Sequence, residues 1–221
     1  MTLINLLRRG IPRSILIIAI LSASLPLIAS FEVTQALLNK VKAEFGSDAE
    51  KRVSSWGNLM ASSSNKSLAD KDKLVLVNDF FNSSIMFVDD INLWKKEDYW
   101  ATPVEFLSMG AGDCEDFSIA KYFTLKELGV PEENLRITYV KAIEINQAHM
   151  VLTYFETKRS TPLVLDNLIP EIKPANQRGD LIPVYSFNGG GLWVAKSRGG
   201  GERVGDSSKI SLWKDLENRM Q

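Results

Sequence analysis

The order of secondary-structure patterns along this chain constrains its fold more than any other feature. Apolar residues recur at helical spacing in the first part of the chain, and the alternating or continuous apolar stretches typical of strands follow later. Helices that precede a run of strands indicate an α+β domain, in which helices pack on an antiparallel sheet. The predicted helices span residues 34–46, 47–60, 71–81 and 114–128, with a weaker one from Ser211, and the predicted strands span residues 135–142, 148–155, 163–165, 184–187 and 192–195.

The remaining segments carry turn-forming residues without a clear period. The serine-rich stretch 62–67 and the stretch 82–112, rich in Trp, Asp and Pro, are therefore predicted to be irregular. Glycines at 189–191 and 199–201 are expected to form hairpin turns. No repeat or linker divides the sequence, so residues 31–221 are predicted to form one domain.

The first 30 residues differ from the rest of the chain. Arginines at positions 8, 9 and 13 precede an apolar run from Ile15 to Ile28, and small residues follow it. This pattern predicts a secretory signal peptide over residues 1–30, with an uncleaved anchor as the alternative, and a folded part outside the cytoplasm. Removing three arginines and no acid moves the formal net charge from −1 to −4. With no basic patch or RNA-binding signature, the chain is not expected to bind nucleic acid.

The chain contains one cysteine, Cys114, so it cannot form an internal disulfide, and one histidine, His149. A free thiol kept in an oxidising compartment suggests that the thiol has a use. Cys114 is expected at the start of a helix, His149 at the start of a strand, and Asp166 after the next short strand. Taken separately, these are ordinary residues: a small buried side chain, a surface or core histidine, and a turn residue.

Together the three residues suggest thiol catalysis. A helix packed on the sheet could bring them to one place, and cysteine, histidine and aspartate are the minimum set for a thiol nucleophile. The histidine would take the thiol proton, and the aspartate would orient the imidazole ring. A helix N-terminus would lower the thiol pKa and offer backbone N–H groups to an oxyanion.

The same order resembles the transglutaminase-like, papain-like superfamily of cysteine enzymes. Several stretches resemble the bacterial transglutaminase-like cysteine proteinases of the LapG type more closely, over about residues 80–193. The stretches that carry this resemblance are WATPVEFLSMGAGDCEDFSIAKYFTLKELGVP, YVKA, HMVLTYF, PLVLDNL and RGDLIPVYSFNGGGLW. The resemblance implies a papain-like or transglutaminase-like core with Cys114 at a helix N-terminus.

What the resemblance implies about function is specific. Members of this family are periplasmic proteases that cut a large cell-surface adhesin near its N-terminus, which releases the adhesin and disperses a biofilm. They depend on calcium and are sequestered by an inner-membrane receptor for cyclic di-GMP. By the same resemblance Cys114 is the nucleophile, His149 the general base and Asp166 the orienting acid. The acids beside the cysteine, Asp113 and Glu115, match calcium ligands, and Asp116 is added from the same motif.

The acids around Cys114 also have a physical interpretation. Carboxylates supply the hard oxygen ligands that calcium prefers, and a bound cation would offset a negative field that otherwise disfavours a thiolate. Alternatively, acids in a first helical turn are favourable through the helix dipole and need no metal.

Two other functions remain open at this point. One is a transglutaminase or amidase that uses the same triad, and the other is a calcium-stabilised binding module with a structural cysteine.

Overall fold

The computed structural model describes residues 31–64, 67–196 and 199–220, within one compact unit that spans Phe31–Gln221. The predicted signal peptide, residues 1–30, lies outside the described residues. In the described part of the chain, no helix combines the length and the hydrophobicity needed to cross a membrane.

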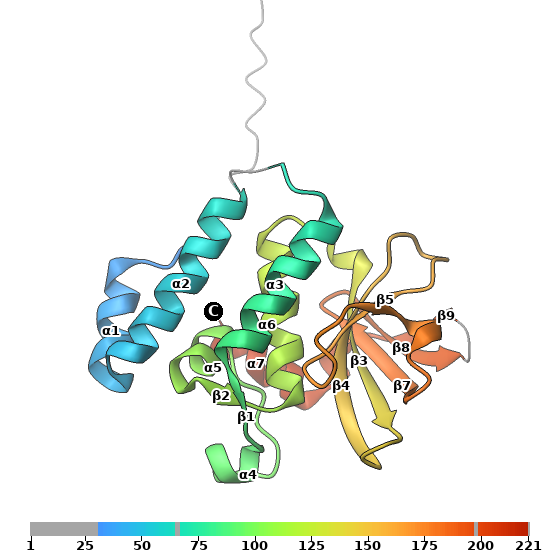
Figure 1. Cartoon of the computed structure of the whole chain (residues 1–221). Coiled ribbons are helices and arrows are strands. Elements are labelled where there is room, and N and C mark those ends of the chain that lie inside the picture. The colour runs from blue at the N-terminus through green and yellow to red at the C-terminus, as the bar shows by residue number, and fades with distance from the viewer. Residues whose placement is uncertain (1–30, 65–66, 197–198, 221) are drawn as a thin grey trace, which may run out of the picture. The chain divides into compact units, whose positions relative to one another are not determined.

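Helices form one side of this unit and a curved sheet forms the other (Figure 1). The helices are α1 (Gln35–Phe45), α2 (Ser47–Ser64), α3 (Asp70–Ser84), α4 (Asp90–Leu93), α5 (Pro103–Met109), α6 (Cys114–Glu127) and α7 (Ser211–Arg219). Short 3₁₀ turns cover Glu132–Asn134, Ala175–Gln177 and Ser207–Lys209.

The first helices follow the predicted pattern, with one correction. The Thr34 hydroxyl caps α1 by accepting from the Leu37 N–H, and Gly46 ends the helix at a φ of 88°. The predicted loop from Ser62 was wrong in its first residues, because α2 continues to Ser64. There the Ser62 hydroxyl donates to the Leu59 carbonyl of the preceding turn, so the serine satisfies its hydrogen bond without leaving the helix.

The prediction of irregular structure over residues 82–112 was also wrong. This segment contains α4, α5 and a small parallel sheet of β1 (Met86–Phe87) and β2 (Ala111–Gly112). Thr102 and Glu105 form a reciprocal capping box at the start of α5, and Gly110 ends that helix in the left-handed conformation. Both signals are visible in the sequence TPVEFLSMG, but a helix of seven residues is too short to show a clear period.

The main sheet has seven antiparallel strands in the order β6-β5-β4-β3-β7-β8-β9. The strands are β3 (Leu135–Ala142), β4 (Gln147–Tyr154), β5 (Leu163–Leu165), β6 (Lys173–Pro174), β7 (Leu181–Asn188), β8 (Gly191–Lys196) and β9 (Gly199–Gly205). The first glycine run does serve the β7–β8 hairpin. The glycines at 199–201 instead begin β9, a strand that the sequence did not predict.

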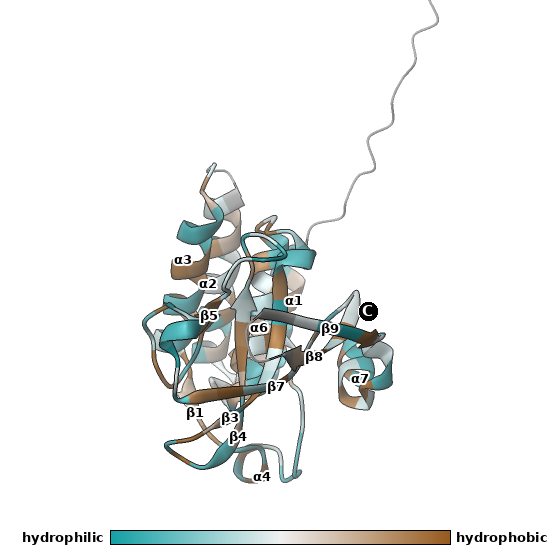
Figure 2. Ribbon diagram, turned by 90° about the vertical axis from the view of Figure 1, so that its right-hand side faces the viewer, coloured by the Kyte–Doolittle hydropathy of each residue, from teal (hydrophilic) through white to brown (hydrophobic). Residues whose placement is uncertain are grey.

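The two faces of the sheet pack against different partners. On β4, Met150 and Leu152 point into the main core, where α6 packs against β4 and β3. The alternate residue Val151 points to the opposite face, where it joins a small cluster with Val140 and Val164. Hydrophobic and hydrophilic residues alternate around α3, another helix of the core (Figure 2). The sheet therefore holds α6 against the strand that carries His149.

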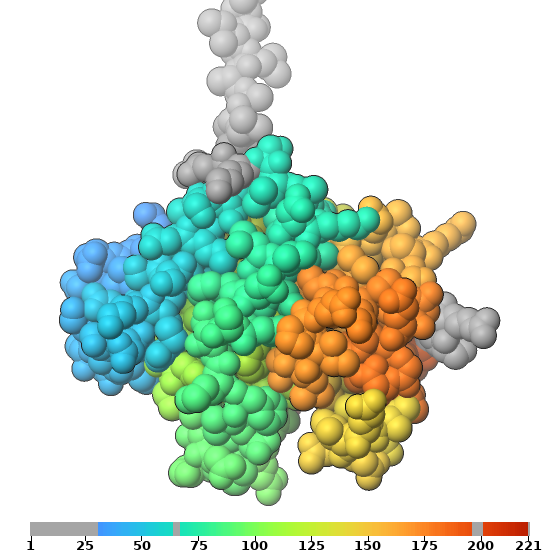
Figure 3. Space-filling model, viewed as in Figure 1, coloured from blue at the N-terminus to red at the C-terminus, as the bar shows by residue number. Residues whose placement is uncertain are grey.

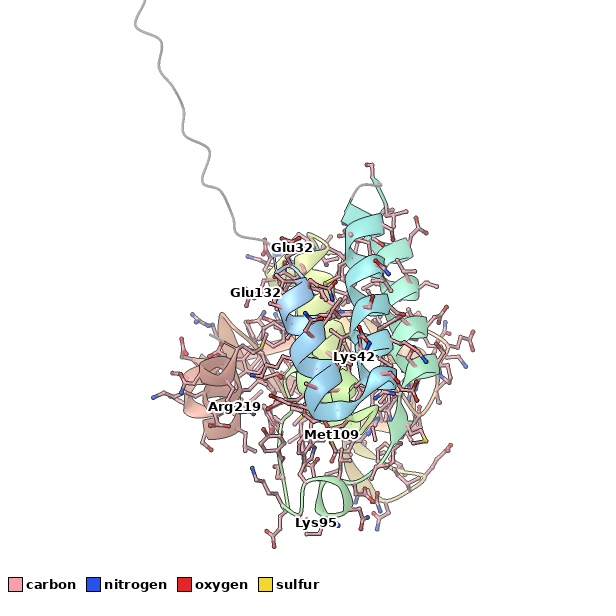
Figure 4. All side chains as sticks on the ribbon, turned by 90° about the vertical axis from the view of Figure 1, so that its left-hand side faces the viewer. Glu32, Lys42, Lys95, Met109, Glu132 and Arg219 are labelled. Carbon is pink, nitrogen blue, oxygen red and sulfur yellow. The ribbon has the colours of Figure 1, made fainter. Side chains whose placement is uncertain are left out.

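The C-terminal helix is anchored by one arginine, labelled on α7 in Figure 4. Arg219 Nη1 donates to the Tyr99 hydroxyl at 2.9 Å and to Glu105 Oε2 at 2.5 Å, and Nη2 donates to the Trp100 carbonyl at 2.5 Å. The next residue, Ala101, donates its N–H to Asp116 Oδ1 at 2.7 Å. Arg219 thus connects the last helix to the segment that supports the start of α6.

We expect an Arg219→Met variant to lower the free energy of unfolding by about 1–3 kcal/mol, because a half-buried carboxylate and a carbonyl lose their donor. Urea denaturation would measure this change. Lys214→Met, on an exposed position of α7, is the matched control and should change the free energy by less than about 0.5 kcal/mol. Equal effects of the two substitutions would contradict the anchoring role of Arg219.

Candidate active site

Cys114 is the first residue of α6, directly after β2 and the N-cap residue Asp113. A side chain at Gly112 would collide with the carboxylate of Asp116 and with the ring of Phe106, so only glycine fits at this approach to the helix. The parallel pairing of β2 with β1 sets the direction from which the chain enters α6. The sequence motif GDC therefore fixes the thiol at a helix N-terminus, as predicted.

The Cys114 thiol lies between acidic side chains and strand β4. Its Sγ donates to Glu115 Oε2 at 3.1 Å, and it lies within hydrogen-bonding reach of the backbone N–H of Met150, the residue after His149. Burial, and then the negative charge of Glu115, raise the pKa of the thiol well above its usual value. In this arrangement the thiol is protonated, and its hydrogen-bond acceptor is Glu115.

His149 and Asp166 form a buried pair. His149 is the third residue of β4, and Asp166 directly follows β5, the neighbouring strand. His149 Nε2 lies 2.8 Å from Asp166 Oδ1, and the two residues are 3% and 1% exposed. Because the ionised carboxylate accepts a hydrogen bond from Nε2–H, Nδ1 remains the free nitrogen of the ring. The predicted pairing of histidine with an orienting acid is therefore present.

Asp166 is ionised despite its burial. Burial alone would raise its pKa, but hydrogen bonds from His149 and from Arg178 outweigh burial and bring the pKa to about 2. The backbone carbonyl of Asp166 accepts from Asn82 Nδ2 at 2.8 Å and from Lys121 Nζ at 3.2 Å. Arg178, Asn82 and Lys121 were not among the residues selected from the sequence, because nothing in their local pattern links them to Asp166.

Three carboxylates meet beside the cysteine. Oxygens of Asp90, Asp113 and Glu115 lie within 4.8 Å of one another, close enough to hold one metal ion. Among the described residues, Asp90 Oδ1 and Asp113 Oδ1 are buried without a hydrogen-bond partner. Burial, followed by the charge of neighbouring acids, raises the pKa values of all three carboxyls. Such mutual repulsion favours a cation or retained protons at this place.

Asp90 was not predicted from the sequence. It opens α4, and it is brought beside Asp113 by the pairing of β1 with β2. The stretch VDDINLW contains two adjacent acids, but nothing local distinguishes Asp90 from the exposed Asp89.

Asp116, the third acid of the predicted set, lies behind this group. It is fully buried, its Oδ1 accepts from the Ala101 N–H, and its Oδ2 has no hydrogen-bond partner among the described residues. Burial and the charge of Asp113 raise its pKa well above the usual value. Asp116 is thus close enough to interact with the acidic group, although it is not one of the three residues whose oxygens converge.

The molecular surface is hollowed at the end that carries α4 and the tip of the β3–β4 hairpin (Figure 3). Figure 3 shows this hollow between the green segment around α4 and the yellow tip of the β3–β4 hairpin. β2, which leads into α6, and the start of β4 lie at the same end in Figure 1. A polypeptide substrate could therefore approach the residues at the start of α6 and β4 from this side.

Comparisons with known proteins identify the family to which the chain belongs. The profile of a family described as bacterial transglutaminase-like cysteine proteinases matches residues 45–194. The solved structure of EGTA-treated LapG from Legionella pneumophila is 44% identical, with a TM-score of 0.74 over 86% of this chain and 99% of that chain. Calcium-bound LapG from the same organism is 45% identical, with a TM-score of 0.71 over 83% of this chain and 97% of that one. No curated protein sequence matches the chain.

The family profile spans a range that contains Cys114, His149 and Asp166, and the solved structure of EGTA-treated LapG superposes on most of the chain. The predicted family and the transglutaminase-like fold are therefore confirmed. The chain belongs to the bacterial transglutaminase-like cysteine proteinases and is a cysteine peptidase.

Proposed function

We propose that this chain is a calcium-dependent periplasmic endopeptidase that cuts the N-terminal region of a large cell-surface adhesin. Cys114 is the nucleophile, His149 the general base and Asp166 the acid that orients the imidazole. The observation that carries the proposal is the buried His149–Asp166 pair, whose histidine lies on β4, next to the Met150 N–H that the Cys114 thiol reaches.

Each residue of the triad has one task. The Cys114 sulfur attacks the scissile carbonyl and passes its proton to the free Nδ1 of His149. Asp166 stabilises the imidazolium that forms, and His149 then protonates the leaving amine. Water, activated by the same histidine, releases the acyl group from Cys114. The start of α6 provides backbone N–H groups near the developing oxyanion.

The acidic residues beside Cys114 fit a calcium ion. Asp90, Asp113 and Glu115 provide convergent carboxylate oxygens, and two buried oxygens, Asp90 Oδ1 and Asp113 Oδ1, lack a partner among the described residues. Hard oxygen ligands of this kind suit Ca²⁺, and a relative that is 45% identical has been solved in a calcium-bound form. When bound, calcium supplies positive charge that offsets the carboxylates facing the thiol. Glu115 would then bind the ion, and the thiol would no longer have to donate its hydrogen bond to this carboxylate.

The substrate, location and regulator are proposed from the resemblance to the LapG type and from the pattern of residues 1–30. An adhesin outside the inner membrane requires an exported protease, and the predicted signal peptide supports export. The same resemblance supports an inner-membrane receptor for cyclic di-GMP that binds and sequesters the protease.

The test is to incubate the purified protein with the N-terminal part of a candidate adhesin, in calcium or in excess chelator. We expect one cut in calcium and none in chelator. Full cleavage in chelator would refute the calcium dependence. A fluorescent amine that becomes attached to the adhesin without chain cleavage would show that the enzyme transfers acyl groups to amines instead.

A further inference from the structure

We propose that Arg178 is a positioning residue of this peptidase, which fixes the carboxylate of Asp166 and through it the ring of His149. The inference rests on the triad proposed above and adds to it a residue that touches neither the substrate nor the thiol.

The two oxygens of Asp166 have separate partners. Oδ1 accepts from His149 Nε2 at 2.8 Å and from the Leu168 N–H at 3.0 Å. Oδ2 accepts from Arg178 Nη2 at 2.6 Å. A carboxylate with one oxygen held by a guanidinium cannot rotate freely about its last bond, so Oδ1 stays directed at the imidazole.

Burial makes this contact important. Asp166 is 1% exposed and Arg178 is 3% exposed, so neither charge can be satisfied by bulk water. Removing one partner from a buried ion pair leaves an uncompensated charge, which costs more than the pair itself contributes. Without the guanidinium, the Asp166 carboxylate would have to turn toward another donor or take up a proton. Either change would alter the hydrogen bond that Asp166 accepts from His149 Nε2.

Arg178 is itself held in place. Its Nε donates to Asp180 Oδ1 at 3.0 Å, and Nη2 donates to Asp180 Oδ2 at 2.8 Å. The backbone N–H of Arg178 donates to the Ala175 carbonyl at the end of the 3₁₀ turn Ala175–Gln177. Asp180 lies just before β7, and its carbonyl accepts from the Ile143 N–H. The fork that holds Asp166 is therefore supported from the turn between β6 and β7.

The main chain of Asp166 is fixed from the opposite side. Asn82 on α3 and Lys121 on α6 both donate to its carbonyl oxygen, and Lys121 also donates to Asn82 Oδ1 at 2.8 Å. With the backbone held by these two residues, the remaining freedom of Asp166 is rotation of its side chain. Arg178 on Oδ2, together with the Leu168 N–H on Oδ1, removes this freedom, and Arg178 is the only side chain other than His149 that is bonded to the carboxylate among the described residues.

The chemical consequence concerns the tautomer of His149. Oδ1 directed at Nε2 keeps the proton on that nitrogen and leaves Nδ1 free to take the thiol proton. A reoriented carboxylate lets the proton occupy either ring nitrogen. Only the fraction of enzyme molecules with Nδ1 unprotonated can then take the thiol proton. We therefore expect a loss in kcat with little change in KM, since Arg178 is buried and its guanidinium is bonded to Asp166 and Asp180.

Kinetics of Arg178→Lys and Arg178→Met, in calcium, test the proposal, and Arg178→Lys keeps the charge in case the methionine variant does not fold. We expect kcat to fall about 10- to 100-fold, as when an outer partner of a functional histidine is lost, with the smaller loss for lysine. In an Asp166→Asn background the same substitutions should add less than about a twofold loss, because their effect passes through Asp166. The control is Arg159→Met, with unchanged kcat. Arg159 is an exposed arginine that lines, together with Arg178, a cavity on the face of the sheet that carries Val140, Val151 and Val164.

A second readout needs no substrate. His149 is the only histidine of the chain, so a ¹⁵N spectrum of untagged protein contains a single imidazole. We expect one tautomer, protonated at Nε2, in the parent protein and a mixture in the Arg178 variants, as judged from the two ring-nitrogen shifts.

Three results would overturn the proposal. Full kcat in Arg178→Lys and Arg178→Met beside an inactive Asp166→Asn would refute the role of Arg178 alone. Equal losses in both backgrounds, with the imidazole signal unchanged, would reduce Arg178 to a residue that only stabilises the fold. Full kcat in Asp166→Asn would instead refute the proposed triad, and this inference with it.

Discussion

A Cys114→Ser variant is expected to fold normally and to lose peptidase activity by about 10⁴-fold or more in kcat/KM, the scale seen when a nucleophile of a catalytic triad is removed. The substitution replaces one sulfur by oxygen at the start of α6 and leaves the hydrogen-bonding capacity of the side chain intact. A hydroxyl with the same neighbours stays protonated, so attack on the peptide carbonyl stops. Initial rates on a peptide substrate in calcium measure the loss.

Two controls show that this loss is chemical. The melting temperature of the variant should stay within about 2 °C of the parent value, because no buried apolar volume is removed. Since Cys114 is the only cysteine, alkylation of the parent protein by iodoacetamide modifies a single site and should inactivate it in proportion to labelling. Substantial activity in Cys114→Ser, or in fully alkylated protein, would exclude the thiol as nucleophile.

The order of elements in the sequence carried most of the information about the triad. A helix-start cysteine, a strand-start histidine and a strand-end aspartate become neighbours once a helix packs on adjacent strands, and β4 lies next to β5 as this argument requires. The pairing of His149 with Asp166 could therefore be predicted. The partners of Asp166 could not, because Asn82 and Arg178 come from a distant helix and from a turn, and only the tertiary fold brings them to the acid.

The acidic group shows the same limit. Asp113 and Glu115 stand out beside the cysteine, whereas Asp90 joins them through the parallel pairing of two strands of two residues each. Strands of this length leave no alternation in the sequence. The short α5 was missed for the same reason, although its capping box and terminal glycine are local signals that depend on no period.

The charges around the proposed catalytic residues are divided. Carboxylates of Asp90, Asp113 and Glu115 gather on the side of the thiol, while Arg178 and Lys121 lie on the side of Asp166. Burial and then the charges of Glu115 and Asp113 raise the pKa of the thiol, whereas hydrogen bonds from His149 and Arg178 keep Asp166 ionised despite its burial. The protein thus already keeps the proposed orienting acid charged, whereas the proposed nucleophile has no comparable source of positive charge among the described residues. The proposed dependence on calcium is consistent with this division.

The stability of the protein should therefore depend on calcium and pH together. Carboxyls with raised pKa values retain protons in the folded state over a range where the unfolded chain has lost them, so the free energy of unfolding falls as pH rises above the ordinary value of 3.8. Calcium replaces these protons. The rise in melting temperature on adding calcium should thus be larger at about pH 8 than at about pH 5, as measured by calorimetry.

A buried lysine changes its charge in the same pH range as the carboxyls, so its effect on stability must be distinguished from theirs. Burial lowers the pKa of Lys121 to about 7, which makes stability rise with pH above that value, in the opposite direction. Lys121 donates to Asn82 and to the Asp166 carbonyl and not to the acidic group. Its contribution to stability is therefore the same in calcium and in chelator at one pH, and it cancels when the two melting temperatures are compared.

Asp90→Asn should reduce the calcium-induced rise in melting temperature, whereas Asp89→Asn, at the exposed position beside it, should leave this rise unchanged. If both variants respond to calcium like the parent protein, the ion does not bind at Asp90, and the carboxylates next to Cys114 must be explained by the helix dipole alone.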